Sequence, residues 1–131
     1  MKIGRAIHIL AFLLVLVTTF ALIYSLGLST GTIEGTVSIG PWTPVEPVGG
    51  SHPPSEVYTS RHIILENPLL PRTEIQINGT GYFKAEVRSG TYTLTMINCS
   101  FIGCSRVLPM TVTVNPGQTT ALQINIDTGI R

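Results

Sequence analysis

The chain has 131 residues, 44% of them hydrophobic, with 8 basic and 7 acidic side chains. This composition excludes an intrinsically disordered protein, which is rich in charge and poor in apolar residues. The length excludes a two-domain enzyme, and a net charge of only +1 leaves no large basic field for nucleic acid.

The first predicted element is a long apolar helix over residues 7–28. Lys2 and Arg5 precede it, and the next charged residue is Glu34. About 20 apolar residues cross a hydrocarbon core of about 30 Å, so this run of 22 residues is long enough to span a membrane. The positive-inside rule then places the N-terminus in the cytoplasm and everything after residue 28 outside.

Two other interpretations of residues 1–28 differ in their consequences. Ser25 and Gly27 are small enough to form a signal-peptidase site, in which case the segment is a cleaved signal peptide and the remainder is secreted. A buried core helix is disfavoured, because the segment has no polar face at a period of 3.6 residues. We therefore expect a membrane anchor or signal peptide over residues 1–28 and an exported domain over residues 29–131.

The exported part is large enough for one hydrophobic core. Its apolar residues alternate with polar ones, which predicts strands that bury one face. The alternating stretches are residues 33–39, 75–77, 83–87, 92–96, 112–114 and 122–126, and a less regular strand is predicted over 58–65. No stretch after Leu28 has helical periodicity, so the domain is predicted to be all-β.

Turn signals separate these strands. Asn and Gly residues at 78–81, 89–90 and 115–117 predict tight reversals. We expect hairpins that give an antiparallel meander, closed as a seven-stranded β-sandwich. Residues 41–54 hold five of the nine prolines, together with Gly49 and Gly50, and are predicted to form a long loop.

Several motifs resemble one known family. The order Gly-Thr-Gly-Tyr-Phe, then Val, then Gly-Thr-Tyr-Thr-Leu over residues 79–94 resembles the carboxypeptidase regulatory-like domain, a transthyretin-like (prealbumin-like) sandwich. The Gly-Pro-Trp-Thr-Pro-Val motif at 40–45 and the Asp-Thr-Gly-Ile-Arg ending at 127–131 resemble its small exported members. The chain lacks their Cys in the proline-rich loop and the Asp before Gly79, so no disulfide is transferred from the family. The resemblance implies a binding or scaffolding module rather than a catalyst.

Cys99 and Cys104 are the only cysteines, with Ser-Phe-Ile-Gly between them. In an oxidising compartment such a pair is expected to form a disulfide. A metal site is disfavoured, because no second pair or nearby His completes four ligands. A redox-active pair is also disfavoured, because such pairs usually occur as Cys-x-x-Cys at the start of a helix, and this motif is absent.

Two sequons and one aromatic group are the remaining surface candidates. Asn78 and Asn98 each begin an Asn-x-Ser/Thr sequon and accept N-glycans if the host glycosylates exported proteins. Alternatively, Asn78 is present only because it stabilises its turn. For Asn98, glycosylation competes with formation of the disulfide by Cys99. Trp42, His52 and Tyr58 form a candidate patch for a peptide or glycan; the alternative is that Trp42 folds back and caps an open end of the sandwich.

Catalytic candidates are few. Asp127, the only Asp, lies in an Asp-Thr-Gly triplet like those of aspartic proteases, which need a pair of such carboxylates. His52 and His62 have no acid or nucleophile at a characteristic spacing. We expect no catalytic residue, metal or cofactor.

The sequence therefore predicts a membrane-anchored extracytoplasmic module that binds a surface protein, peptide or glycan. The alternative is a pilin-like filament subunit, which shares the layout of a basic N-terminus, an apolar helix and a β-domain. Against that alternative, no acidic residue lies near the helix start, and Lys2-Ile3-Gly4-Arg5 is a poor prepilin-peptidase site.

Overall fold

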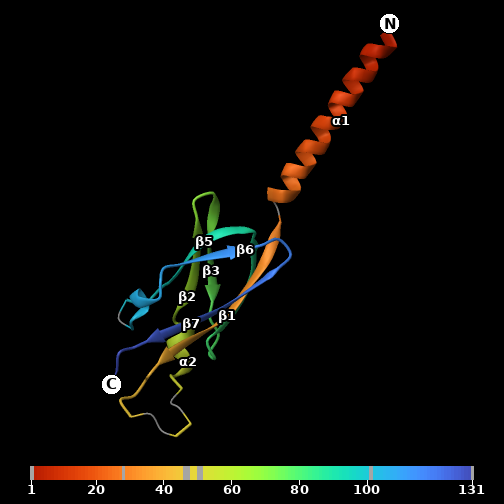
Figure 1. The fold of residues 1–131 in the computed structure, drawn as a ribbon. Coiled ribbons are helices and arrows are strands. Elements are labelled where there is room, and N and C mark those ends of the chain that lie inside the picture. Colours follow the sequence, from red (N-terminus) through yellow and green to blue (C-terminus); the bar gives the residue numbers. More distant parts are fainter. Residues whose placement is uncertain (1, 28, 46–47, 50–51, 101, 131) are drawn as a thin grey trace.

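The computed structural model describes residues 2–27, 29–45, 48–49, 52–100 and 102–130. Leu28, Gly50, Phe101 and Arg131, which belong to segments or motifs discussed above, lie outside the described residues. Figure 1 shows one long helix at the N-terminus, followed by a body of strands.

Helix α1 spans Lys2–Gly27. Over Lys2–Ser25 it is long and apolar enough to cross a membrane, and none of that segment is buried inside the structure. Its Thr and Ser hydroxyl groups form hydrogen bonds within the helix: Thr18 Oγ1 donates to the Val15 carbonyl at 3.0 Å, and Ser25 Oγ donates to the Leu22 carbonyl at 2.9 Å. Such bonding within a helix is compatible with an apolar environment.

The described part of the chain contains two sheets. One has three strands in the order β4-β1-β7, and the other has four in the order β3-β2-β5-β6. The strands are β1 Thr30–Gly40, β2 His62–Asn67, β3 Leu70–Gln76, β4 Tyr82–Arg88, β5 Gly90–Met96, β6 Met110–Val114 and β7 Thr119–Asp127. A short helix α2, Ser55–Thr59, precedes β2, and a 3-10 turn η1, Cys104–Arg106, precedes β6.

Both sheets bury one face in a single shared core. Ile33 and Phe83 from the three-stranded sheet belong to the same buried cluster as Leu65 and Leu94 from the four-stranded sheet, and each is at most 1% exposed. Along most strands the residues between the buried ones are polar and exposed; in β2, Ile64 between Ile63 and Leu65 is also buried, at 2% exposure. The predicted alternation is thus confirmed, and the architecture is a β-sandwich.

Strand β7 runs parallel to β1, with registers from Thr32 opposite Thr119 to Gly40 opposite Asp127. The prediction of a wholly antiparallel sandwich is therefore wrong for this sheet. The end of β6 lies next to the start of β1. The turn that follows β6 carries the chain into the three-stranded sheet, and in this turn the Gly117 amide donates to the Thr30 carbonyl at 2.8 Å. Because β7 starts beside the start of β1, the two strands run in the same direction.

The predicted meander is also wrong. The turns at 78–81, 89–90 and 115–117 connect β3 to β4, β4 to β5 and β6 to β7, and in each case the two strands lie in different sheets. Paired neighbours in sequence are instead β2 with β3 and β5 with β6. Turn residues determine that the chain reverses, whereas the packing of the inward faces determines which strands pair.

The segment predicted as a strand over 58–65 is divided. Tyr58 lies in α2, and β2 begins only at His62, so the prediction of no helix after Leu28 is wrong here. Pro54 precedes α2, and its carbonyl accepts from the Val57 amide at 2.9 Å. Proline suits a helix start because no amide donor is needed there, and five residues are too few to show a 3.6-residue period.

Candidate functional site

The two ends of the sandwich differ in the length of their connections. At the end next to α1, the connections are residues 68–69, residue 89 and residues 115–118; we call this the proximal end. At the opposite, distal end they are residues 41–61, 77–81 and 97–109, and the loop after β1 is seen there in Figure 1. Long connections on a rigid scaffold commonly carry binding groups, so the distal end is the candidate site.

The three residues of the predicted aromatic patch lie in different environments. Tyr58 is only 8% exposed, and its ring lies 3.1 Å from the position that a Cβ on Gly81 would occupy. Trp42 is half-buried and packs against the core; that it caps an open end of the sandwich stays a prediction. His52 is exposed. Only His52 and the outer part of Trp42 therefore offer surface, and ligand binding there stays a prediction.

A polar cluster that the sequence did not single out lies on the outer face of β1 and β4. The Tyr82 hydroxyl donates to Glu34 Oε2 at 2.9 Å, and Lys84 Nζ lies 3.6 Å from the same oxygen. The hydrogen bond to Glu34, with desolvation and the charge of Glu34, raises the pKa of the Tyr82 phenol. Strand alternation predicts that the side chains of Glu34, Tyr82 and Lys84 all lie on the outer face. Their contact with one another depends on the register of β1 with β4, which cannot be predicted from the turn residues.

Two open depressions lie at the distal end. One, of about 540 Å³, has Tyr82, Lys84 and Asn78 among its lining residues. The other, of about 550 Å³, is lined in part by Ser38 and Asn125. Because both are open and carry polar side chains, they suit a peptide or glycan lying on the surface better than an enclosed apolar ligand.

Asp127 stabilises the C-terminal segment. Its Oδ1 accepts from the Gly129 amide at 2.9 Å, and its Oδ2 lies 3.9 Å from Arg106 Nη1. His62 Nδ1 contacts Glu74 Oε1 across β2 and β3.

Within the described ranges, no group of three or more His, Cys, Asp or Glu residues is placed to hold a metal ion.

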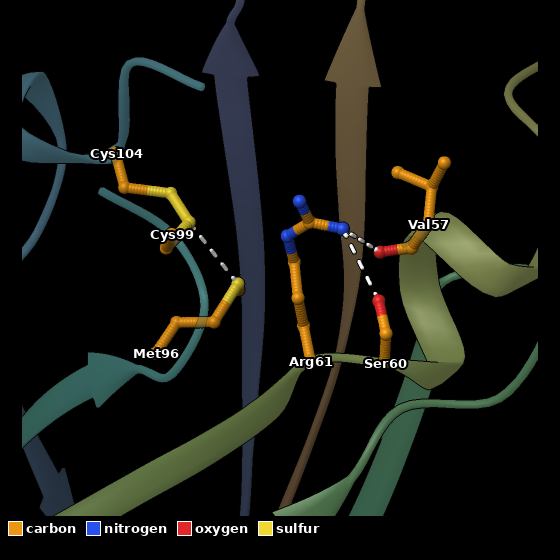
Figure 2. The surroundings of a disulfide bond; sticks show 6 residues. All are labelled: Val57, Ser60, Arg61, Met96, Cys99 and Cys104. Carbon is orange, nitrogen blue, oxygen red and sulfur yellow. Dashed lines mark hydrogen bonds between the residues drawn. A yellow bond between two sulfur atoms is a disulfide. The ribbon is translucent and has the colours of Figure 1, made fainter. Parts of the chain in front are cut away.

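Cys99 and Cys104 form a disulfide at the distal end (Figure 2). Their Cα atoms are 5.7 Å apart, and each residue is 5% exposed. The Met96 sulfur lies 3.5 Å from Cys99 Sγ, so the bridge is part of the core. It fixes the start of η1 against the end of β5.

Arg61 lies beside this region (Figure 2). Its Nη1 donates to the Val57 carbonyl of α2 and to Ser60 Oγ. Burial lowers the pKa of the Arg61 guanidinium, and its buried Nε has no hydrogen-bond partner in the described part of the chain. Arg61 thus fixes the end of α2 next to the start of β2.

The two sequon asparagines differ in their hydrogen bonds. Asn78 is exposed and uses Oδ1 to accept from the Thr80 and Tyr82 amides at 2.9 and 3.0 Å. Asn98 has a φ of 56°, and its Nδ2 donates to the Ser60 carbonyl at 2.9 Å. Because a glycan is attached at Nδ2, the geometry favours Asn78 as the acceptor. Whether either residue is modified stays a prediction.

Comparison with known proteins supports the fold alone. No protein-family model matches the chain, and no curated protein matches it. A DUF3823 family protein from Parabacteroides merdae is similar in structure with a TM-score of 0.50 and 16% identity, over 76% of this chain and 46% of that chain. A DUF3823 family protein from Bacteroides ovatus has a TM-score of 0.49 and 15% identity, over 74% of this chain and 44% of that one.

The minor pilin GBS52 from Streptococcus agalactiae is also similar, with a TM-score of 0.44 and 17% identity, over 76% of this chain and 44% of that chain. This chain thus spans less than half the length of these three structures. At such low identity the likeness concerns the β-sandwich fold, and the carboxypeptidase regulatory-like resemblance has no matching family model.

Proposed function

We propose that the protein is a membrane-anchored, extracytoplasmic β-sandwich module of the carboxypeptidase regulatory-like type, which binds a protein, peptide or glycan at the cell surface. The proposal includes no catalytic activity. It places α1 in the membrane, the proximal end next to the bilayer and the distal end toward the surroundings.

The anchor is supported by the exposure of α1. Between Ile3 and Tyr24 its large hydrophobic side chains are each more than half exposed, which is unfavourable for a helix in water. Lys2 and Arg5 precede the apolar segment and favour a cytoplasmic N-terminus. The disulfide between Cys99 and Cys104 is typical of an oxidising, extracytoplasmic compartment.

The binding role depends on one observation, the grouping of the long connections at the distal end. Both depressions, the partly exposed Trp42 and Tyr82 lie on this half of the sandwich. Glu34 and Lys84, which Tyr82 adjoins, lie near the middle of the outer face of β1 and β4. The connections at the other end have at most four residues each. A domain tethered by its proximal end presents these groups away from the membrane.

The binding role is tested on arrays of cell-envelope glycans and of peptides, probed with the full-length protein in lipid nanodiscs. We expect a selective signal that Tyr82→Ala or Lys84→Ala weakens about tenfold or more, equivalent to about 1.4 kcal/mol. Arg72→Ala, on β3 near the proximal end, is the matched control and leaves binding unchanged. No selective signal, or equal loss in the control, contradicts a distal binding site.

The pilin-like alternative is favoured by the same uncovered apolar helix, which could pack against copies of itself in a filament. In the described helix, the first turn contains no acidic residue. Electron microscopy of material sheared from cells separates the two functions: filaments that contain this chain support the alternative, and their absence with recovery in membranes supports the anchored module.

A further inference from the structure

Leu69 is a large apolar residue at an exposed position. It lies at the tip of the turn between β2 and β3, and its side chain is 92% exposed. In the described β-domain, the other aliphatic side chains of comparable exposure are Val45 and Val48, at 84% and 109%, both in the loop at the distal end. A single exposed leucine is ordinary on a protein surface, so the position of Leu69 in the fold has to carry the inference.

Hydrogen bonds connect the Leu69 turn to the start of β1. The hydroxyl groups of Ser29 and Ser89 are 2.6 Å apart, and the Ser89 amide donates to the Ser29 carbonyl at 2.9 Å. Two residues beyond Ser89, the Thr91 carbonyl accepts from Asn67 Nδ2 at 2.7 Å, and Asn67 Oδ1 accepts from the Leu69 amide at 2.8 Å. The Leu69 turn therefore belongs to the end of the sandwich where the chain leaves α1, as Figure 1 shows.

The chain length keeps this end close to the bilayer. Helix α1 ends at Gly27 and β1 begins at Thr30, and three residue steps cover about 10 Å when fully extended. A 24-residue segment is about 36 Å long as a helix, longer than a hydrocarbon core of about 30 Å. The end of α1 thus reaches the headgroup layer, and Thr30 lies at most about 10 Å beyond it.

We propose that the proximal end of the sandwich rests on the membrane that α1 crosses, with Leu69 entering the headgroup layer. The inference rests on the proposed anchor. The three connections at this end have at most four residues each, so no long loop holds the domain away from the lipid. A leucine side chain is favourable at the boundary between headgroups and acyl chains.

The contact is apolar rather than electrostatic. Arg72 and Arg88 near this end are balanced by Glu66 and Glu86, and the Glu86 carboxylate accepts from Thr30 Oγ1 at 2.6 Å. One leucine binds lipid weakly, but the covalent link to α1 gives it a high effective concentration at the surface. We therefore expect the same contact on zwitterionic and on anionic bilayers.

The contact is tested with tryptophan fluorescence of full-length protein in nanodiscs whose lipids are brominated near the headgroup. The wild type has one tryptophan, Trp42, at the distal end, so it provides the unquenched baseline. Leu69→Trp adds a second indole at the proximal tip. Val48→Trp is the matched control, because it also replaces a fully exposed aliphatic residue but lies in the distal loop.

We expect brominated lipid to quench the added fluorescence of Leu69→Trp and to leave that of Val48→Trp and the wild type unchanged, in phosphatidylcholine and in phosphatidylglycerol discs alike. The Leu69→Trp emission should also shift to shorter wavelength on incorporation. Equal quenching of both variants, or none at position 69, overturns the contact. Failure of the wild type to enter the discs instead contradicts the anchor, and circular dichroism checks that both variants are folded.

Discussion

Leu94 offers the sharpest test of the sandwich core. Its side chain is fully buried, at 0% exposure, and it lies opposite Leu65 on β2 and Met110 on β6. Truncation of a buried leucine to alanine costs about 2–5 kcal/mol, because transfer free energy is lost and a cavity remains. A domain of this size is stable by about 5–15 kcal/mol in total, so Leu94→Ala removes a large part of the free energy of unfolding.

The assay is thermal unfolding of residues 29–131, followed by circular dichroism. This part is expected to fold alone, because the membrane-length part of α1 is not buried in the structure. Each 1 kcal/mol changes Tm by about 4–8 °C in a domain of this size, so we expect Leu94→Ala to lower Tm by roughly 8–40 °C. The neighbouring Thr93 is exposed on the other face, and Thr93→Ala should change Tm by only a few degrees, as surface substitutions do.

A second pair of variants repeats the test on the other sheet. Phe83 is 1% exposed and Lys84 is exposed, so Phe83→Ala should destabilise the domain by about 3–5 kcal/mol and Lys84→Ala by much less. If the variants at Thr93 and Lys84 lose as much stability as those at Leu94 and Phe83, or more, the assignment of the inward faces is refuted.

Two further predictions concern close contacts. Gly35→Ala should destabilise the domain strongly, because a Cβ there would lie 2.4 Å from the Leu122 carbonyl oxygen and 2.8 Å from the Phe83 ring. Gly40→Ala on the same strand is the control, because a Cβ there meets nothing within 4 Å. Urea unfolding should show a large loss of stability for the first variant and little change for the second. Replacing Cys99 and Cys104 by alanine should cost about 2 kcal/mol, since the bridge closes a short loop, and the domain should still fold; complete unfolding of the double variant would contradict this.

The sequence allowed us to predict which side chains of each strand point into the core, because this depends only on neighbouring residues in the chain. Alternation around Phe83 and Leu94 depends only on successive side chains pointing to opposite faces, and both residues are buried as expected. Sheet membership could not be predicted in this way. The turn before Thr119 is a reversal in either sheet, and only packing of the whole core places β7 parallel to β1.

The candidate site was less accessible to sequence reasoning. Glu34 and Tyr82 are 48 residues apart along the chain and meet because of the register of β1 with β4, which has no local signal. Tyr58 was predicted to be surface-exposed, but a short helix that begins after Pro54 turns it into the core. Single aromatic residues in a proline-rich loop give no indication of which side they face.

Mass spectrometry of the intact protein extracted from its native membranes tests the central claim most directly, because one mass reports both leader retention and cysteine oxidation. The account predicts a chain that retains α1 and lacks two hydrogens through the bridge between Cys99 and Cys104. A soluble species that begins near Leu28 would contradict the anchor. A mature N-terminus at Arg5 or Ala6 would support the pilin-like alternative, and two free thiols would contradict an extracytoplasmic, disulfide-bonded domain.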